Sequence, residues 1–562
     1  MEDIVKQWVL DNVSTDYNTV LRLVTEQSPE NEPYKSLYAA RKVLEEISNK
    51  LEKASGTLGK ELAVLQGTVL FQLGKNHTEC DELSTGEDFL KRALEMLGKV
   101  EGKVKSVTVY ILTCHQLAVL LASRSEHEQA LKFLLDAKTS YDGYKTTSHP
   151  YEEHELLLGP QNPIAEDKRK EQFERLHTHT LYYLAQTYES IGKASIAANY
   201  CFTTLERQLT SKQYDAIDWS LNCATLSQYY LNTDNYRQAR HCLACSEHVL
   251  TEYMDRGEEK DDGIVEKMQQ TKADIARCWV KYCIALLKYS QQLKEEGGGQ
   301  DVLKAREEDF NPFTCIDASA IELGVPCSPI SSFDATRNLF LFGQKCMESA
   351  KCFFSLEWHA SDNVSIVQDH SQLFKHLIFF EPELERKCRM YKRRADMMEG
   401  LLKQLNPQHY LVLMRQLMFE AGIIYSEMAD CKITLASDSE KPTTHAVLKI
   451  NKLISQSLKH FDSFINSFQD HSGKLPDRFD EQCLRSILSA KFWIARLHSK
   501  VVTANPQTQV DHQRKSLENY QWIVAYHKVY PADVERCFAE ELKMCKEMTE
   551  LLPHKLDKMT IV

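Results

Sequence analysis

The stretch Asn222–Leu250, NCATLSQYYLNTDNYRQARHCLACSEHVL, decides the fold because large and small residues recur in it at helical spacing. Leu226, Ser227, Tyr230, Ala239, Leu243 and Ser246 fall at offsets 0, 1, 4, 13, 17 and 20. Two further sets of residues fall at the same offsets. One is Leu184, Ala185, Tyr188, Ala197, Cys201 and Thr204, and the other is Leu117, Ala118, Leu121, Ala130, Leu134 and Ala137. Two antiparallel helices approach closely only where small side chains meet, so each set predicts one packed helix pair.

This arrangement of large and small residues is the tetratricopeptide pattern. Its small position in the second helix falls at residues 86, 130, 197 and 239, at intervals of 44, 67 and 42. The usual period is about 34 residues, so the helices are longer or the loops carry insertions. We therefore expect an all-α, tetratricopeptide-like, right-handed α-solenoid of antiparallel helix pairs. The widest interval contains residues 142–174, which we expect to be a long loop that runs into a helix and contributes to binding specificity.

Three glycines at 297–299, in a charged context, predict a flexible connection. Apolar residues return at helical spacing after Pro326 but match the repeat less well. We therefore divide the chain into an N-terminal helical half, 1–290, a connector, 291–332, and a C-terminal helical half, 333–562. Loops 142–174 and 291–332 are the segments that could order on binding a partner.

Charge and cysteine content narrow the class of protein. The 68 Lys and Arg against 80 Asp and Glu leave a net charge of −12, which argues against nucleic-acid binding and favours a basic partner. The 17 cysteines are scattered through apolar helical patterns, the N-terminus lacks a signal-peptide pattern, and no apolar run reaches the length of a membrane span. These features predict a cytoplasmic protein with reduced thiols and no membrane span.

The opening stretch also raises the question of a metal site, because it holds His241, Cys242, Cys245 and His248. Residues 241 and 242 diverge by about 100° around a helix axis, so the four side chains do not converge on one point. A second Cys-x-x-Cys motif does not occur in the chain. We expect buried thiols that pack between helices, and no metal or other cofactor.

The sequence carries no motif of a nucleotide-binding or hydrolytic enzyme. It lacks a phosphate-binding glycine loop after a strand, Gly-x-Ser-x-Gly and His-Glu-x-x-His. His177 and His179 lie near a helix start without a nearby third ligand. We expect a protein without catalytic residues.

Six stretches are too long and too unusual in composition to be generic repeat matches: residues 31–47, 179–201, 275–283, 364–398, 405–411 and 488–506, among them NEPYKSLYAARKVLEEI and LSAKFWIARLHSKVVTANP. They resemble the KIF-binding protein family, in family order and across nearly the whole chain. The resemblance implies a non-catalytic tetratricopeptide-like solenoid that clasps the motor domain of a subset of kinesins in a groove. It implies that the motor is kept off microtubules, so that microtubule-based transport is regulated. The short segment between Ile47 and Glu61 departs from the family, in which a longer acidic insert stands there, and this leaves any role of the insert in doubt.

Residues on the inner side of the first helices are the candidate binding residues. The inner positions, counted from Leu184 and Leu226, are His179, Tyr182, Tyr183, Gln186 and Glu189, and Leu221, Asn222, Thr225 and Gln228. Aromatic and neutral polar side chains on one face suit a protein interface. The resemblance places Tyr183, Gln186, Gln208 and Thr225 on a motor-facing surface. We therefore predict partner binding by Tyr183, Gln186, Gln208, Asn222, Thr225 and Gln228.

The charge balance suggests how such a surface competes with a microtubule. An acidic groove would attract the basic face that a motor presents to tubulin, so that binding and track engagement exclude each other. The alternative function is a general tetratricopeptide adaptor for peptides or chaperone tails. Adaptors of that kind hold a carboxylate with Lys and Arg on inner helices, which the inner positions lack. The basic cluster in ERKCRMYKRRADMM, residues 385–398, is interpreted as a solvated helix face paired with Glu383 and Glu385.

Overall fold

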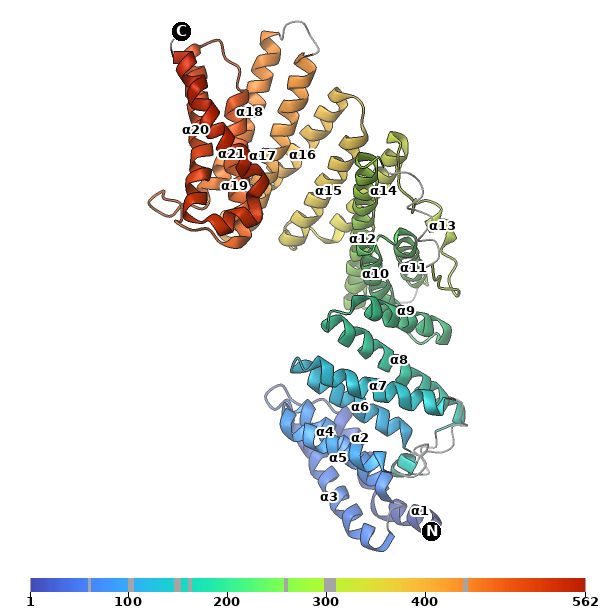
Figure 1. The fold of residues 1–562 in the computed structure, drawn as a ribbon. Coiled ribbons are helices and arrows are strands. Elements are labelled where there is room, and N and C mark those ends of the chain that lie inside the picture. Colours follow the sequence, from blue (N-terminus) through green and yellow to red (C-terminus); the bar gives the residue numbers. More distant parts are fainter. Residues whose placement is uncertain are drawn as a thin grey trace. The chain divides into compact units, whose positions relative to one another are not determined.

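The structure is a computed structural model that describes residues 2–58, 62–99, 106–145, 153–159, 164–256, 261–297, 310–437 and 443–560. Every regular element in these residues is a helix (Figure 1), which confirms the predicted all-α class. Parts of the predicted loops, 146–152, 160–163 and 298–309, lie outside the described residues, as do 59–61 in the segment that departs from the family. The chain forms two compact units, 1–229 with 313–316 and 230–312 with 317–562.

Unit 1 is built from successive helices, of which α1 to α9 each pack on the next, while the short helix η3 packs on α1, α2 and α4 (Figure 1). They are α1 (Glu2–Asn12), α2 (Ser14–Thr25), α3 (Lys35–Leu58), α4 (Ala63–Glu79), α5 (Leu83–Gly98), α6 (Val107–Ser123), α7 (His127–Tyr144), the 3-10 helix η3 (Glu153–Leu158), α8 (Glu166–Ser190), α9 (Ala194–Ser211) and α10 (Ala216–Asn232), whose last three residues belong to unit 2. The widest repeat interval is filled by η3 and the 25-residue helix α8, so residues 142–174 contain more helix than the predicted loop.

The repeat offsets found in the sequence mark the core. Leu117, Leu184 and Leu226, at offset 0, are at most 5% exposed, and so are the small residues Ala130 and Ala197 at offset 13. The tetratricopeptide-like solenoid of packed helix pairs is thus confirmed.

The turns inside the pairs repeat as well. Asp81, Ser125, Gly192 and Asp234, all at offset 8, have left-handed backbones with φ of 61°, 63°, 80° and 55°. In each turn, the amide of the residue that follows the left-handed residue donates a hydrogen bond. The acceptor is the carbonyl of the residue four positions before the left-handed residue, and the N···O distances are 2.8–2.9 Å. This bond closes the end of the first helix, and the next helix begins within three residues. One turn geometry therefore sets the same reversal in all four pairs.

Glycine makes the closest approach possible in the pair α4 and α5. A Cβ atom on Gly86 would lie 2.6 Å from Thr78 Cγ2 and 3.0 Å from the carbonyl oxygen of Gly74. A Cβ atom on Gly74 would in turn lie 2.6 Å from Leu90 Cγ. The repeat therefore requires a small residue at position 86 because the backbones of α4 and α5 touch there.

Unit 2 contains the remaining helices (Figure 1). They are α11 (Tyr236–Asp255), α12 (Asp262–Glu295), α13 (Ser319–Glu322), α14 (Phe333–Phe353), α15 (Ala360–Phe380), α16 (Leu384–Gln404), α17 (Pro407–Ser437), α18 (Thr444–Asn466), α19 (Glu481–Lys500), α20 (Pro506–Val529) and α21 (Pro531–Thr560). The 34-residue helix α12 packs against α14 and α15. For this reason α11 and α12 group with the C-terminal helices, although the sequence division at residue 290 assigned them to the N-terminal half.

The described part of the predicted connector packs against helices in both units. In unit 1, Phe313 is 1% exposed and stacks on Phe202 with a centroid distance of 4.5 Å. In unit 2, the hydroxyl of Tyr282 donates to the Pro326 carbonyl at 2.7 Å, and the Ile330 amide donates to Ser290 Oγ at 2.9 Å. Residues 310–332 are therefore held by core contacts, not free as the glycine-rich sequence before them suggested.

Candidate partner-binding surface

The first helices of three successive pairs present equivalent positions on one side of unit 1. Counted from the offset-0 leucines, position −1 holds Gln116, Tyr183 and Thr225, and position +2 holds Val119, Gln186 and Gln228. We call these six residues, from α6, α8 and α10, the first-helix surface. Each of them is half-buried or exposed, whereas the leucine beside each pair is buried. Helical periodicity thus separates the core face from a face that is free to bind.

Aromatic rings fix the middle of this surface on α8. Tyr183 packs edge-on against His115 of α6 at a centroid distance of 5.3 Å and against Tyr182 at 5.7 Å. Gln186 Nε2 donates to the Tyr182 hydroxyl at 2.7 Å, one turn away. Burial lowers the pKa of His115 to about 3, so its ring is neutral, and its Nε2 lies 2.8 Å from Thr180 Oγ. Tyr183 therefore packs on a neutral, buried histidine ring.

A shallow groove of about 550 Å³ runs between α6, α7 and α8 beside these residues. Its lining includes Val119, Ala122, Tyr183, Gln186 and Ser190. Val119 and Tyr182 are 43% and 42% exposed, which leaves apolar area open to a partner next to amide and hydroxyl groups. Such a mixture of aromatic area and neutral hydrogen-bonding groups suits a protein interface.

On α10, Asn222 and Thr225 are exposed and Gln228 is half-buried. Thr225 Oγ1 donates to the Leu221 carbonyl at 2.8 Å, and Gln228 Nε2 donates to Ser227 Oγ at 3.0 Å. Gln208 stands apart from the other five predicted residues because it lies half-buried on the second helix α9. The structure thus brings Tyr183 and Gln186 onto one helix face and Asn222, Thr225 and Gln228 onto another.

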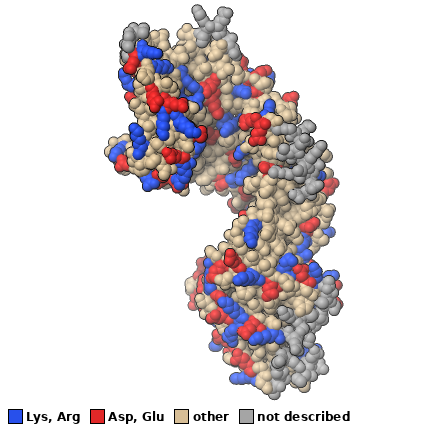
Figure 2. Space-filling model, viewed as in Figure 1, with Lys and Arg blue, Asp and Glu red and all other residues tan. Residues whose placement is uncertain are grey.

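The first-helix surface is nearly uncharged, which corrects the expectation of an acidic groove. Residues 107–123, 176–190 and 216–232 contain no Lys or Arg, and their acidic residues are Glu189 and Asp218. Figure 2 shows largely uncharged surface over α8 and α9. The net charge of −12 is therefore carried elsewhere, and recognition by this surface depends on apolar area and neutral hydrogen bonds.

Sequence reasoning missed two residues of the surface, Gln116 and Val119 on α6. Gln116 Nε2 donates to Thr78 Oγ1 at 3.2 Å, and Val119 lines the groove. Both stand at the offsets that Tyr183 and Gln186 occupy on α8. Counting inner positions from Leu117, as was done from Leu184 and Leu226, would have found them.

The cysteines of the opening stretch are core residues, as predicted. Cys242 and Cys245 are 0% exposed, and burial raises the pKa of the Cys245 thiol. His241 Nδ1 lies 2.5 Å from Glu322 Oε1, within hydrogen-bonding distance, and its Nε2 lies 3.5 Å from Cys245 Sγ. Within the described ranges, no three His, Cys, Asp or Glu side chains are placed to hold a metal ion.

The basic cluster on α16 is only partly the solvated face that the sequence predicted. Arg386 pairs with Glu383 at 3.0 Å on the surface, as expected. Arg394, however, is 2% exposed and forms ion pairs of 3.5 Å with both Glu420 and Glu427 of α17. The residue was misassigned because its acidic partners lie on the next helix, where local spacing gives no signal.

Comparison with known proteins shows the family to which the chain belongs. A family model described as the KIF-1 binding protein C terminal matches residues 217–559. The chain is 36% identical to the KIF-binding protein of Gallus gallus over 96% of both chains and 36% identical to that of Danio rerio over 95% of both. The chain belongs to the KIF-binding protein family. A cryo-EM structure of the KIFBP core is 30% identical and aligns with 53% of this chain and 98% of its own, with a TM-score of 0.36.

No helix within the described residues is long and apolar enough to cross a bilayer.

Proposed function

We propose that this chain is a non-catalytic protein that binds the motor domains of a subset of kinesins and prevents them from binding microtubules. Membership of the KIF-binding protein family across nearly the whole chain supports this proposal. Inhibition then follows from occlusion, because a motor domain bound by this protein cannot present its microtubule-binding face to the microtubule. The protein would act in the cytoplasm, associated with the cytoskeleton through the motors, and regulate microtubule-based transport.

The first-helix surface, with Asn222 and Gln208, is the proposed contact for the motor. Tyr183 and the neighbouring Tyr182 supply rigid contact area at low entropic cost, and the glutamines and the threonine of the surface supply adaptable hydrogen bonds. The lack of Lys and Arg on α6, on residues 176–190 of α8 and on α10 disfavours the alternative, an adaptor that clamps a peptide carboxylate. Binding through this surface should depend only weakly on salt, since it presents few charges.

A double substitution tests the surface directly. Gln186→Lys with Thr225→Lys places two cations on exposed positions, where they meet the basic face of a motor and leave the helices intact. We expect binding to a purified motor domain, measured by interferometry, to weaken about tenfold or more, with unchanged helix content by circular dichroism.

The matched control lies on α7, a second helix of the same unit. Gln129 and Thr139 are exposed, and Thr139 Oγ1 donates to the Leu135 carbonyl at 2.8 Å, as Thr225 Oγ1 does to Leu221. Gln129→Lys with Thr139→Lys should leave the affinity unchanged. If the first double variant binds as tightly as this control, Gln186 and Thr225 are not part of the interface.

A further inference from the structure

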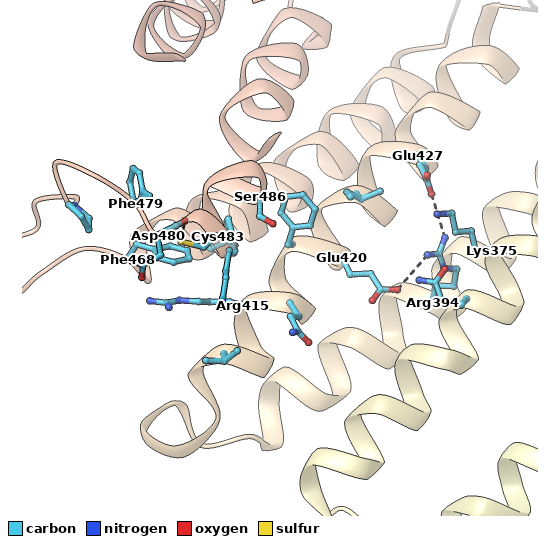
Figure 3. Close-up of a pocket in the computed structure, with 18 of the residues that line it drawn as sticks. Lys375, Arg394, Arg415, Glu420, Glu427, Phe468, Phe479, Asp480, Cys483 and Ser486 are labelled. Carbon is cyan, nitrogen blue, oxygen red and sulfur yellow. Dashed lines mark hydrogen bonds and ion pairs between the residues drawn. The ribbon is translucent and has the colours of Figure 1, made fainter. Parts of the chain in front are cut away.

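Unit 2 has an open groove of about 870 Å³ that the proposed motor contact does not use. One stripe of α17 forms its floor, Val412, Arg415, Phe419 and Ile423, at the three- and four-residue spacing of a single helix face. Lys375 of α15 and Cys483 and Ser486 of α19 also line it (Figure 3). Phe468, just after α18, and Phe479 lie together at one end (Figure 3), and Gln372 and Phe464 belong to the lining as well. We call this the α17 groove.

The apolar residues of the α17 groove are only partly covered by the core. Phe464 and Phe479 are 3% and 6% exposed and belong to the packed interior. Phe419, Ile423 and Phe468 are only half-buried, and Val412 at the rim is 66% exposed. Phe419, Ile423 and Phe468 pack on one side against the C-terminal core, and because they are only half-buried, their other side forms a hydrophobic strip that remains open.

The arginines at the two ends of the groove are both balanced by carboxylates. At one end, Arg394 is neutralised by Glu420 and Glu427 at 3.5 Å each, and its Nε donates to Ser371 Oγ at 3.0 Å. These ion pairs are drawn in Figure 3. Arg478, at the opposite end, pairs with Asp533 at 2.8 Å. Both arginines are therefore satisfied within the protein.

Arg415, in the middle of the aromatic end, has no such acidic partner. Its Nε donates to Ser467 Oγ at 2.9 Å and its Nη2 to the Ser467 carbonyl at 2.5 Å, and its guanidinium lies over the Phe468 ring at 3.7 Å. Among the described residues it forms no ion pair with a carboxylate, and its Nη1 donates to none of their oxygens. Burial lowers the pKa of this guanidinium, so its charge is held in a poorly solvated place.

We propose that the α17 groove binds a segment of a partner protein in which an acidic side chain stands beside bulky apolar ones. The ligand carboxylate accepts from Arg415 Nη1, and the apolar side chains cover Phe419, Ile423 and Phe468. Of the four cations that line the groove, Arg394 and Arg478 are paired with carboxylates and Lys375 is exposed. Arg415 is the half-buried cation that is fixed on the aromatic ring without a carboxylate, which is the basis for an acidic ligand. This site goes beyond the proposed motor contact and does not depend on it, because all its residues lie in unit 2.

Cys483 provides a readout inside the groove. It is half-buried among the lining residues, whereas Cys352 on α14 is exposed and does not line it. The probe is a synthetic 14-residue amphipathic peptide with leucines on one face and glutamates beside them, added to the full chain. We expect the peptide to bind by fluorescence anisotropy and to slow alkylation of Cys483, followed by mass spectrometry, without slowing that of Cys352.

Peptide and protein variants then test the chemistry. A peptide with every glutamate replaced by glutamine, and the variant Arg415→Ala with the original peptide, should each bind about tenfold more weakly. Arg514→Ala, which removes an exposed arginine on α20, serves as the control and should not change binding. Equal binding of the glutamate and glutamine peptides would overturn the proposal.

A second variant covers the case in which Arg415→Ala disturbs the fold through Ser467. Val412→Glu adds a negative charge at the exposed rim, touches no core residue, and should also weaken binding of the acidic peptide. If Val412→Glu and wild type bind the peptide equally, the groove is not its site. Protection of Cys483 in the free protein, together with a dimer in analytical ultracentrifugation, would show that a second copy covers the groove and would likewise refute the proposal.

Discussion

Replacing Gly86 by alanine should destabilise unit 1, although alanine is the better helix former. Gly86 lies in α5, where alanine would gain about 1 kcal/mol of helix propensity over glycine. The added Cβ, however, would lie 2.6 Å from Thr78 Cγ2, 3.0 Å from the Gly74 carbonyl oxygen and 3.1 Å from the Thr78 amide nitrogen. Two of these atoms are backbone, so α4 and α5 must separate for the methyl group to fit.

Overpacking of this kind costs about 1–3 kcal/mol for the methyl group itself. Separating α4 from α5 also loosens Leu90, which packs against Gly74 and is 0% exposed. The opposing gain in propensity offsets only part of these costs, and we expect a net loss of about 1–2 kcal/mol.

Gly98 at the end of the same helix is the matched control. A Cβ atom there meets only Tyr110 Cε2, at an ordinary 3.8 Å. Gly98→Ala should therefore be neutral or stabilising by up to about 1 kcal/mol. A chain of two units need not unfold in one step, so local stability is measured best by hydrogen exchange of α4 and α5. Equal exchange rates in the Gly86→Ala and Gly98→Ala proteins would refute the close contact that the repeat pattern implies.

Three further changes test other parts of the structure. Gly192→Ala puts a side chain on a backbone with φ of 80° and should cost about 1 kcal/mol, whereas Ser125→Gly at the equivalent turn should raise the thermal midpoint; the reverse order would contradict the turn assignment. His115 has a pKa of about 3 in the fold against an ordinary value of 6.5, so the unfolded chain binds the proton at a higher pH than the folded chain. Stability is therefore lost as the pH falls from about 6.5 to 3. His115→Gln should make this loss shallower, as urea denaturation at several pH values would show. Arg394→Ala leaves two partly buried carboxylates unpaired and should cost about 3–5 kcal/mol at pH 7, against less than about 0.5 kcal/mol for Lys392→Ala in an exposed pair; similar values for the two variants would show that the Arg394 ion pairs are not structural.

The helix pairs could be predicted from the sequence because their signal is local. Large and small residues at fixed offsets, such as Leu184 and Ala197, report directly which positions are buried. The structure shows left-handed turn residues at a fixed offset in the repeats, which the sequence did not predict, and only Gly192 among them carries the residue type that usually marks such a turn. Three of the four turns use Asp or Ser, and composition alone does not reveal them.

Features that depend on contacts between distant segments could not be predicted. Arg394 appears as one of a row of basic residues, and only the packing of α16 on α17 shows that it is buried between Glu420 and Glu427. Phe313 follows a glycine-rich stretch, yet its ring stacks on Phe202 across a separation of more than one hundred residues.

The candidate surface was predicted in its positions but not in its charge. Counting from the core leucines placed Tyr183, Gln186 and Thr225 on exposed or half-buried faces, which the structure confirms. The net charge of the chain suggested an acidic groove, because an average over 562 residues does not show where the charges lie. Whether these residues contact a motor stays a prediction.

Microtubule co-sedimentation of purified kinesin motor domains tests the central claim most directly. Each motor is mixed with microtubules and with increasing amounts of this chain, and the Gln186→Lys, Thr225→Lys protein is run in parallel. The occlusion account predicts that a subset of motors moves to the supernatant at a one-to-one ratio and that the double variant fails to release them. Motors that stay on the microtubules while bound to this chain, or release at amounts far below one to one, would contradict it.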